Sequence, residues 1–264
     1  MIAPRQLPPS YRSFNATWNA PLGRNGRIAQ LLGTSRAGIR HRGPFAWQPN
    51  NTTRAFEFPW AYEHVMGLGR GLTVLEVGGG MSGLQFVLGH EGQRVINVDP
   101  GLSARGRGWE VSADFHRRLQ KIFDAPVDLR EATIGGAGVP DGSVDVLLSV
   151  STIEHFTADD LAELAEHARR VLRPGGHAVL TIDLFLDLAP FTERERNQWG
   201  TNIDIRALLE QAGLELVEGD PAELCGFDAF EPQAIQSRLM DLLTGSFASL
   251  VQCVVARAPE PAIA

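Results

Sequence analysis

Three glycines follow an acidic side chain at the end of a short apolar segment. Residues 73–77 are apolar except for Thr73 and Glu76, and Gly78, Gly79 and Gly80 come directly after them. The pattern predicts a buried strand that opens through a flexible backbone onto the first turn of a helix. Nucleotide-like cofactors are held in this way at the carboxyl edge of a parallel sheet.

The glycine spacing fits two kinds of cofactor. Gly78, Gly80 and Gly83 match the G-x-G-x-x-G dinucleotide fingerprint, and Asp99 stands about where the ribose-binding acid of an NAD site belongs. Glu76 favours a different ligand, because a carboxylate repels a pyrophosphate but attracts a cation. S-adenosylmethionine (SAM) carries a sulfonium and an ammonium and no phosphate. A strand-to-helix turn without a ligand is disfavoured, because three glycines cost conformational entropy.

Polar side chains that can carry chemistry follow a second apolar segment, residues 144–150. Ser151, Glu154 and His155 come just beyond it, where an acceptor molecule can meet the cofactor. His155 is the first candidate for a catalytic base, because histidine titrates closest to neutral pH; the alternative is a histidine that packs or caps the next helix. Glu154 can hold an ammonium or act as the partner of the base. Further candidates are Asp183, Asp187 and His64.

The elements that must position these residues alternate from residue 71 onward. Strands are predicted at residues 72–77, 94–98, 127–131, 144–150 and 178–183, and helices at 82–89, 109–122 and 158–172. A further helix at 203–212 leads to strands at 214–218 and 250–256. This alternation predicts an α/β fold with a Rossmann-like, mostly parallel sheet and helices on both faces.

Residues 1–70 differ from the rest, because they are rich in Pro, Arg, Asn and aromatic side chains. We expect an irregular or short-helical N-terminal extension, with a helix over residues 53–66 that Pro59 either enters in the first turn or breaks. Its aromatic side chains either pack against the main domain or roof a substrate pocket as a lid. Residues 71–264 would form the main domain, with acceptor-side insertions at 184–202 and 220–249 and a frayed tail at 258–264.

Five motifs resemble the class I SAM-dependent methyltransferase superfamily, in particular its small-molecule, methyltransferase-11-like members. They are Glu76-Val-Gly-Gly-Gly80, Asn97-Val-Asp99, Pro140-Asp-Gly-Ser-Val-Asp-Val-Leu-Leu-Ser149, Ile153-Glu-His-Phe156 and Val171-Leu-Arg-Pro-Gly-Gly176. The resemblance covers residues 72–183 continuously and implies a seven-stranded sheet with a β-hairpin at its C-terminal edge. It also implies SAM as the cofactor and methyl transfer as the activity.

The resemblance implies roles for individual residues. Asp99 would hold both ribose hydroxyls, and Glu76 would support the glycine loop or the ammonium of SAM. Thr133 and Ile134 stand where the family often places an acid near the adenine. The implied cofactor-binding residues are Glu76, Gly78, Gly79, Gly80, Asp99, Thr133, Ile134 and Ser149, and no metal is expected.

The sequence leaves the acceptor open. We expect O- or N-methylation of a small molecule such as a sugar, a nucleotide sugar or a natural-product intermediate. The alternatives are a non-catalytic SAM- or nucleotide-binding protein and an NAD-dependent oxidoreductase. Calorimetry with these cofactors would separate the three.

Composition excludes some partners. A net charge of -7 argues against a nucleic-acid partner. Arg36, Arg40, His41 and Arg42 form either a local basic patch or, more simply, a solvated loop. No apolar run reaches membrane-spanning length and no secretory signal is found, so we expect a cytoplasmic protein without a membrane partner. Cys225 and Cys253 have no metal spacing and are expected to be buried thiols. A homodimer is left open.

Overall fold

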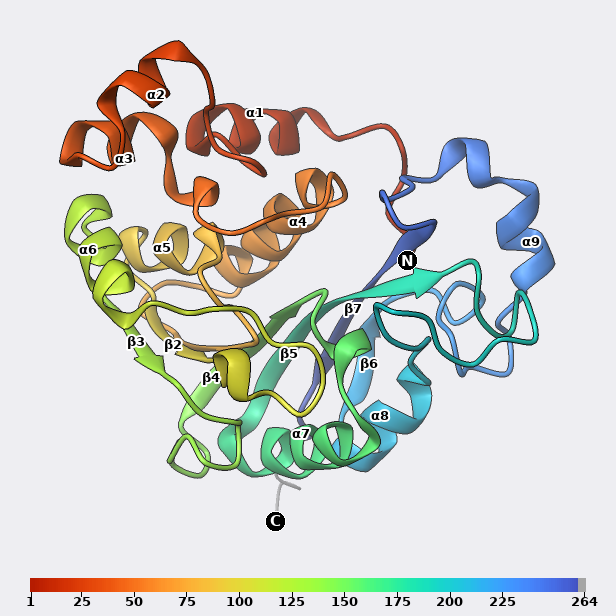
Figure 1. Cartoon of the computed structure of the whole chain (residues 1–264). Helices are drawn as coiled ribbons and strands as arrows, with labels where there is room; N and C mark the ends of the chain where they lie inside the picture. Colours follow the sequence, from red (N-terminus) through yellow and green to blue (C-terminus); the bar gives the residue numbers. More distant parts are fainter. Residues whose placement is uncertain (261–264) are drawn as a thin grey trace.

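The sheet of the computed structural model, which describes residues 1–260, has seven strands in the order β3-β2-β1-β4-β5-β7-β6 (Figure 1). Neighbouring strands are parallel except that β7 runs antiparallel to both β5 and β6. This confirms the predicted Rossmann-like fold with its reversed C-terminal edge. The strands are β1 (Thr73–Val77), β2 (Arg94–Val98), β3 (Val127–Arg130), β4 (Val144–Val150), β5 (Leu172–Phe185), β6 (Glu215–Glu218) and β7 (Ser249–Arg257).

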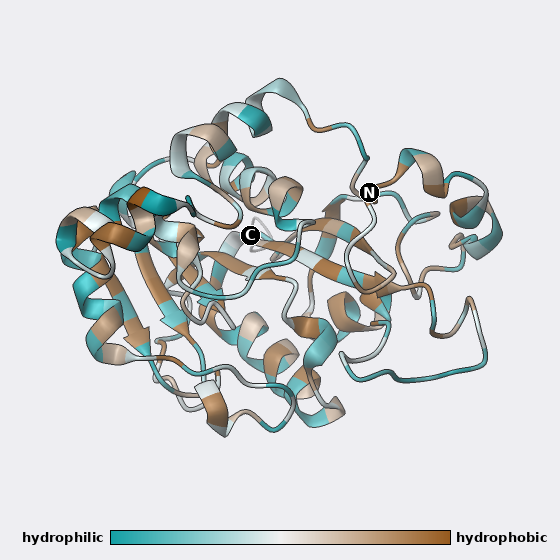
Figure 2. Ribbon diagram, turned by 45° about the horizontal axis from the view of Figure 1, so that its top comes forward, coloured by the Kyte–Doolittle hydropathy of each residue, from teal (hydrophilic) through white to brown (hydrophobic). Residues whose placement is uncertain are grey.

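Helices cover both faces of the sheet, and alternate side chains of each strand point to opposite faces. Val74 and Leu148 join the core under α4, α5 and α6, whereas Leu75 and Leu147 join the core under α7 and α8. Figure 2 shows the strands mostly in the hydrophobic colour and the helices with both colours. The helices are α1 (Pro9–Trp18), α2 (Arg27–Leu32), α3 (Arg36–Arg42), α4 (Arg54–Gly67), α5 (Gly83–His90), α6 (Ala113–Phe123), α7 (Ala158–Val171), α8 (Ile205–Ala212) and α9 (Pro232–Ser237).

Two predicted boundaries are wrong for physical reasons. The helix expected from residue 109 begins at Ala113, because the Ser112 side chain accepts a hydrogen bond from the backbone N–H of Phe115 and caps it there. Residues 104–112 therefore remain a loop. The strand expected at residues 178–183 extends over Leu172–Phe185, because β7 provides backbone partners along residues 177–185.

Helix α4 continues through Pro59, which lies beyond the first turn, so neither expected alternative holds. Proline has no backbone N–H, so the carbonyl of Ala55, four residues earlier, loses its partner within the helix. The side-chain amide of Asn15 on α1 donates a hydrogen bond of 2.8 Å to that carbonyl. The proline is tolerated because another helix supplies the missing donor.

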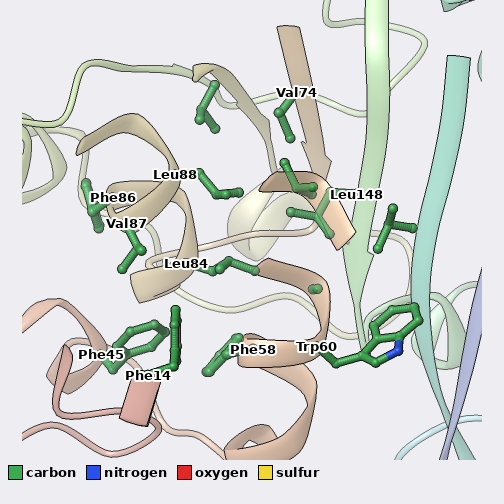
Figure 3. Packing of buried hydrophobic residues seen from close by; sticks show 14 of the residues in the cluster. Phe14, Phe45, Phe58, Trp60, Val74, Leu84, Phe86, Val87, Leu88 and Leu148 are labelled. Atoms are coloured by element: carbon green, nitrogen blue, oxygen red, sulfur yellow. The ribbon is translucent and has the colours of Figure 1, made fainter. Parts of the chain in front are cut away.

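The N-terminal extension is largely helical and shares the core of the main domain. Phe14, Phe45 and Phe58 are buried together with Leu84 of α5 (Figure 3). The ring centroids of Phe45 and Phe58 lie 4.8 Å apart. The run from Arg36 to Arg42, expected to be a loop, forms helix α3 with Ser35 as its N-cap.

Three further expectations concern the periphery. No helix among residues 1–260 is long and apolar enough to cross a membrane. Cys225 and Cys253 are free thiols, of which Cys253 is buried and Cys225 half-buried. Fraying was expected from residue 258, but the backbone N–H of Ala258 donates to the Gly176 carbonyl at 2.8 Å. Residues 261–264 lie outside the described part of the chain.

Candidate active site

A cavity of about 400 Å³ opens at the carboxyl ends of the central strands. Glu76 and the glycine loop reach it from β1, and Asp99 reaches it from β2. Ser151 follows β4 and Asp183 lies near the end of β5. Parallel strands bring residues distant in sequence to one edge of the sheet, and ligands bind there in open α/β folds.

The glycine loop lies directly against the segment that follows β4. Gly78 has φ 71°, and a Cβ at this position would lie 2.1 Å from Cγ2 of Thr152. The Thr152 hydroxyl donates to the Gly78 carbonyl at 3.2 Å. Gly80 also has a positive φ, of 51°, and is covered by Gln48 of the extension. The side-chain oxygen of Gln48 accepts a hydrogen bond from the Met81 N–H at 2.9 Å. No residue with a side chain fits at Gly78 without moving Thr152.

Asp99 is held by the backbone on both carboxylate oxygens. Its Oδ2 accepts from the Gly80 N–H at 2.8 Å, and its Oδ1 accepts from the Gly101 N–H at 2.7 Å. Burial raises the pKa of this carboxyl, and the two hydrogen bonds oppose the rise. Each oxygen keeps a lone pair for a ligand hydroxyl. Thr133 and Ile134 line the same cavity.

Glu76 is almost completely buried beside the glycine loop and lines the cavity. Its Oε2 has no hydrogen-bond partner among the described residues. Burial, and then the nearby Asp99, raises the pKa of this carboxyl to about 8. A buried carboxyl oxygen without a donor is unfavourable, so the site favours a ligand that brings a donor or a positive charge.

An ion pair from the N-terminal extension contributes Arg54 to the cavity wall. Arg54 and Glu57 of α4 lie 2.6 Å apart, and Arg54 lines the cavity. The hydroxyls of Ser151 and Thr181 donate to Glu57 at 2.6 and 2.8 Å. Arg54 also donates to the Ser151 carbonyl at 3.3 Å. The extension therefore fixes the ends of β4 and β5.

Sequence reasoning missed this pair. An available signal was an arginine and a glutamate three residues apart among apolar neighbours such as Phe56 and Phe58. A buried charged pair at that spacing has to contact another polar group.

Two further carboxyls lie near the Arg54–Glu57 pair. Asp183 lines the cavity, and burial together with the charge of Glu57 raises its pKa to about 7. Glu154 is fully buried, and both of its carboxyl oxygens lack hydrogen-bond partners among the described residues. Burial and the charge of Asp183 raise the pKa of Glu154 well above its ordinary value. Glu154 does not line the cavity, but its Oε1 lies 4.0 Å from Nε2 of His155.

We expect Asp183→Asn to flatten the pH dependence of stability. The folded protein retains the Asp183 proton up to about pH 7, whereas the unfolded chain loses it near the ordinary pKa of 3.8. Folding thus becomes less favourable as the pH rises through this window. Between pH 5 and pH 7 the free energy of unfolding, measured by urea denaturation, should fall by about 1 to 2 kcal/mol less in the variant than in the wild type. Asp159→Asn, at an exposed acid, is the control, and equal slopes in all three proteins would contradict the expectation.

His155 lines the cavity with one ring nitrogen already engaged. Its Nδ1 is hydrogen-bonded to the carbonyl oxygen of Trp199. A carbonyl only accepts, so Nδ1 carries the proton, and Nε2, which lies 4.0 Å from Oε1 of Glu154, keeps its lone pair. Burial lowers the pKa of this histidine, which keeps the ring neutral at pH 7. Nε2 is therefore able to accept a proton.

Three candidates from the sequence lie away from the cavity. Ser149 is fully buried, does not line the cavity and donates to the Val77 carbonyl at 3.2 Å. Asp187 pairs with Arg194 at 3.4 Å on the surface. His64 lies between the Trp60 carbonyl and Glu218. The cavity instead contains Ser151 and Thr152, directly after β4.

Aromatic side chains from three loops close the outer wall of the cavity. The guanidinium of Arg107 lies 4.7 Å from the ring centroid of Trp109 and 3.9 Å from that of Trp199. The rings of Trp199 and Phe247 are 3.9 Å apart. Trp199 and Phe247 belong to segments 184–202 and 220–249, so both segments contribute to the cavity. No group of three His, Cys, Asp or Glu side chains suited to a metal ion occurs within residues 1–260.

Residues 75–180 match the family described as a methyltransferase domain. An uncharacterized methyltransferase of Mycobacteroides abscessus is 33% identical over 126 residues, which cover 48% of this chain and 44% of the relative. A Mycolicibacterium smegmatis protein described as a probable S-adenosylmethionine-dependent methyltransferase is 32% identical over 94 residues, 34% of this chain and 36% of the relative. The chain spans less than half the length of these curated relatives.

Two solved structures share the fold over nearly the whole chain. The cyclase SpnF superimposes with a TM-score of 0.57 at 14% identity, covering 99% of this chain and 100% of SpnF. The 1,6-didemethyltoxoflavin-N1-methyltransferase of Burkholderia thailandensis, solved with S-adenosylhomocysteine, has a TM-score of 0.53 at 17% identity, covering 98% and 95%. At such identities the likeness concerns the fold, and the two names describe different reactions on that fold.

Proposed function

We propose that this chain, in which residues 75–180 form a methyltransferase domain, is a class I SAM-dependent methyltransferase acting on an oxygen or nitrogen of a small-molecule acceptor. One observation carries the proposal. The same cavity is lined by a glycine loop, by the carboxyl of Glu76, whose Oε2 has no partner among the described residues, and by the proton acceptors His155 and Asp183. A cofactor and an acceptor can therefore meet within one enclosed space.

The residues present fit SAM better than a dinucleotide. The orphaned oxygen of Glu76 suits the positive charge of SAM and would repel a pyrophosphate. The fixed carboxylate of Asp99 can accept from two ribose hydroxyls, and Thr133 and Ile134 are available to the adenine. When bound, SAM supplies an electrophilic methyl group. Of the predicted cofactor residues, only Ser149 is not included.

The remaining chemistry is assigned to this chain's own side chains. The free Nε2 of His155 accepts the proton of an acceptor hydroxyl or amine, and Asp183 offers a second place for that proton. The aromatic wall around Trp199 excludes water. Residues 1–70 serve as a fixed part of the acceptor site, a role supported by the lining positions of Arg54 and Phe58. A largely apolar wall suits a small organic acceptor.

We expect His155→Ala to lower turnover about tenfold, less than the usual loss for a positioned base because Asp183 can still take the proton. SAM affinity should stay unchanged, since no predicted cofactor contact is removed. Methyl transfer to a true acceptor and calorimetry with SAM measure the two quantities. His155→Gln, which keeps a polar side chain without a basic nitrogen, should behave like the alanine variant. Wild-type turnover in both variants would return His155 to a structural role.

We expect SAM affinity to rise with pH through Glu76. The pKa of the free carboxyl is about 8, so a cation that pairs with the carboxylate must displace its proton at lower pH. Between pH 6 and 7.5 the affinity should increase up to about tenfold per pH unit. The isosteric variant Glu76→Gln should show a flat profile and bind about tenfold more weakly at pH 7.5. A flat wild-type profile in calorimetry would contradict the role of Glu76.

Calorimetry with SAM, S-adenosylhomocysteine and NAD tests the function itself. Binding of SAM and S-adenosylhomocysteine, without NAD, is the expected result. Absence of SAM binding at millimolar concentration would refute the proposal, and binding of NAD alone would favour an oxidoreductase. Binding of SAM without turnover on any acceptor from a metabolite screen would favour a non-catalytic SAM-binding protein.

A further inference from the structure

The first 56 residues carry charge of only one sign. They contain eight arginines and no aspartate or glutamate, although the whole chain has a net charge of -7. Only Arg54 of these eight forms an ion pair, with Glu57 in the cavity wall. The arginines that remain on the surface have therefore not been neutralised by acids of the described chain.

Several of these arginines lie on or beside α2 and α3, where α3 meets both α2 and α6 at one corner of the molecule (Figure 1). Arg118 of α6 donates to the Thr34 carbonyl, and Arg40 of α3 donates to the Ile122 carbonyl, so the elements adjoin. We call this surface the basic face. Its exposed cations are Arg24, Arg27, Arg36, Arg40, Arg118 and Lys121.

Acids do little to offset the basic face. Asp114 of α6 is paired with Arg117, which is outside the set. Asp124 follows α6 and is exposed. None of the six cations forms an ion pair with any acid within residues 1–260. The face keeps a strong positive potential in an otherwise acidic protein.

Aliphatic side chains project from the same corner. Leu31 is 87% exposed and Ile28 is 60% exposed, and they lie three residues apart on one side of α2. Leu22, just before this helix, is 49% exposed. Single exposed apolar residues are ordinary, but these are grouped beside unpaired arginines.

We propose that the basic face is a docking surface for an anionic lipid bilayer. The arginines would lie among acidic headgroups, and Ile28 and Leu31 would enter the interface between headgroups and acyl chains. A nucleic acid would match the charge but would leave the aliphatic side chains in water. Binding here is peripheral, and it replaces the expectation that the protein has no membrane partner.

Sedimentation with lipid vesicles tests the proposal on the full-length chain. In 0.1 M KCl, vesicles of phosphatidylcholine with about one-third phosphatidylglycerol should bind at least about tenfold more protein than phosphatidylcholine alone. Raising KCl to 0.5 M should remove most of this preference, because salt screens the attraction. Equal binding to both kinds of vesicle would overturn the proposal.

Matched variants separate the basic face from net charge. Arg24→Ser/Arg27→Ser and Ile28→Ser/Leu31→Ser should each lower binding to the anionic vesicles at least about tenfold. Arg169→Ser/Arg196→Ser removes two exposed arginines elsewhere and should change it less than about threefold. All six positions are exposed, so thermal unfolding should be unchanged.

Three outcomes would refute lipid docking. The control variant could lose as much binding as the two test variants. The protein could self-associate in a salt-dependent manner without binding vesicles, which would identify a second copy as the partner. It could instead bind duplex DNA but not vesicles, which would identify a nucleic acid. SAM calorimetry is independent of all three, so failure here leaves the proposed function intact.

Discussion

Gly78→Ala should abolish measurable SAM binding, with a loss of affinity of at least about a hundredfold. The new Cβ would lie 2.1 Å from Cγ2 of Thr152, and the backbone there has φ 71°, which alanine adopts only under strain. Either the loop or the segment after β4 must move, and both line the cavity. Calorimetry with SAM measures the loss.

Gly142→Ala is the matched control. Gly142 has a similar φ of 59°, but no atom within 4 Å would meet its Cβ. This variant carries the backbone strain without the collision and should bind SAM like the wild type. Adding Thr152→Ser to Gly78→Ala removes the closest methyl group and should restore part of the affinity. Wild-type affinity in Gly78→Ala would show that the loop does not hold the cofactor.

The residues that line the cavity at the ends of β1 and β2 were predictable because their signals are local. Glu76, the glycines and Asp99 lie at the ends of β1 and β2. The glycines indicate the backbone conformation of the loop, and the two acids indicate the charge of the site. In open α/β folds, a strand followed by such a loop marks the edge of the sheet where ligands bind. Seven of the eight predicted cofactor residues accordingly line the cavity.

The eighth, Ser149, shows the limit of local reading. Its hydroxyl is buried against the Val77 carbonyl, whereas Ser151, two positions later, reaches the cavity from a backbone with a positive φ of 38°. The bend that follows β4 decides which serine lines the cavity. That bend depends on Glu57 and Thr181, whose contacts with Ser151 are far apart in sequence.

Long-range polar contacts explain the other failures. Asn15 donates to the Ala55 carbonyl, which Pro59 leaves without a partner in the helix. The two residues are 40 positions apart, and nothing in either segment indicates that they pair. Glu57 lies 94 residues from Ser151 and 124 from Thr181. Periodicity locates helix α4, but only the folded chain shows that its single buried ion pair faces the cavity.

Arg54→Ala should destabilise the fold by about 3 to 5 kcal/mol, because it leaves the fully buried Glu57 without its cation. Urea denaturation at pH 7 measures the change. Burial alone would lower the pKa of the Arg54 guanidinium, but Glu57 and Asp183 outweigh this and raise it. Arg54 therefore stays charged, and its removal should lower the stability of the fold by the full cost of an unpaired Glu57.

A double-mutant cycle isolates the pair from simple loss of packing. Arg54→Ala/Glu57→Ala removes both charges and should cost less than the sum of the two single variants, because no lone buried charge remains. Arg206→Ala breaks an exposed pair with Asp228 at 3.1 Å and should change stability by less than about 0.5 kcal/mol. If Arg54→Ala costs no more than Arg206→Ala, the pair does not anchor α4 to the ends of β4 and β5. The extension would then be free to act as the lid that its aromatic composition first suggested.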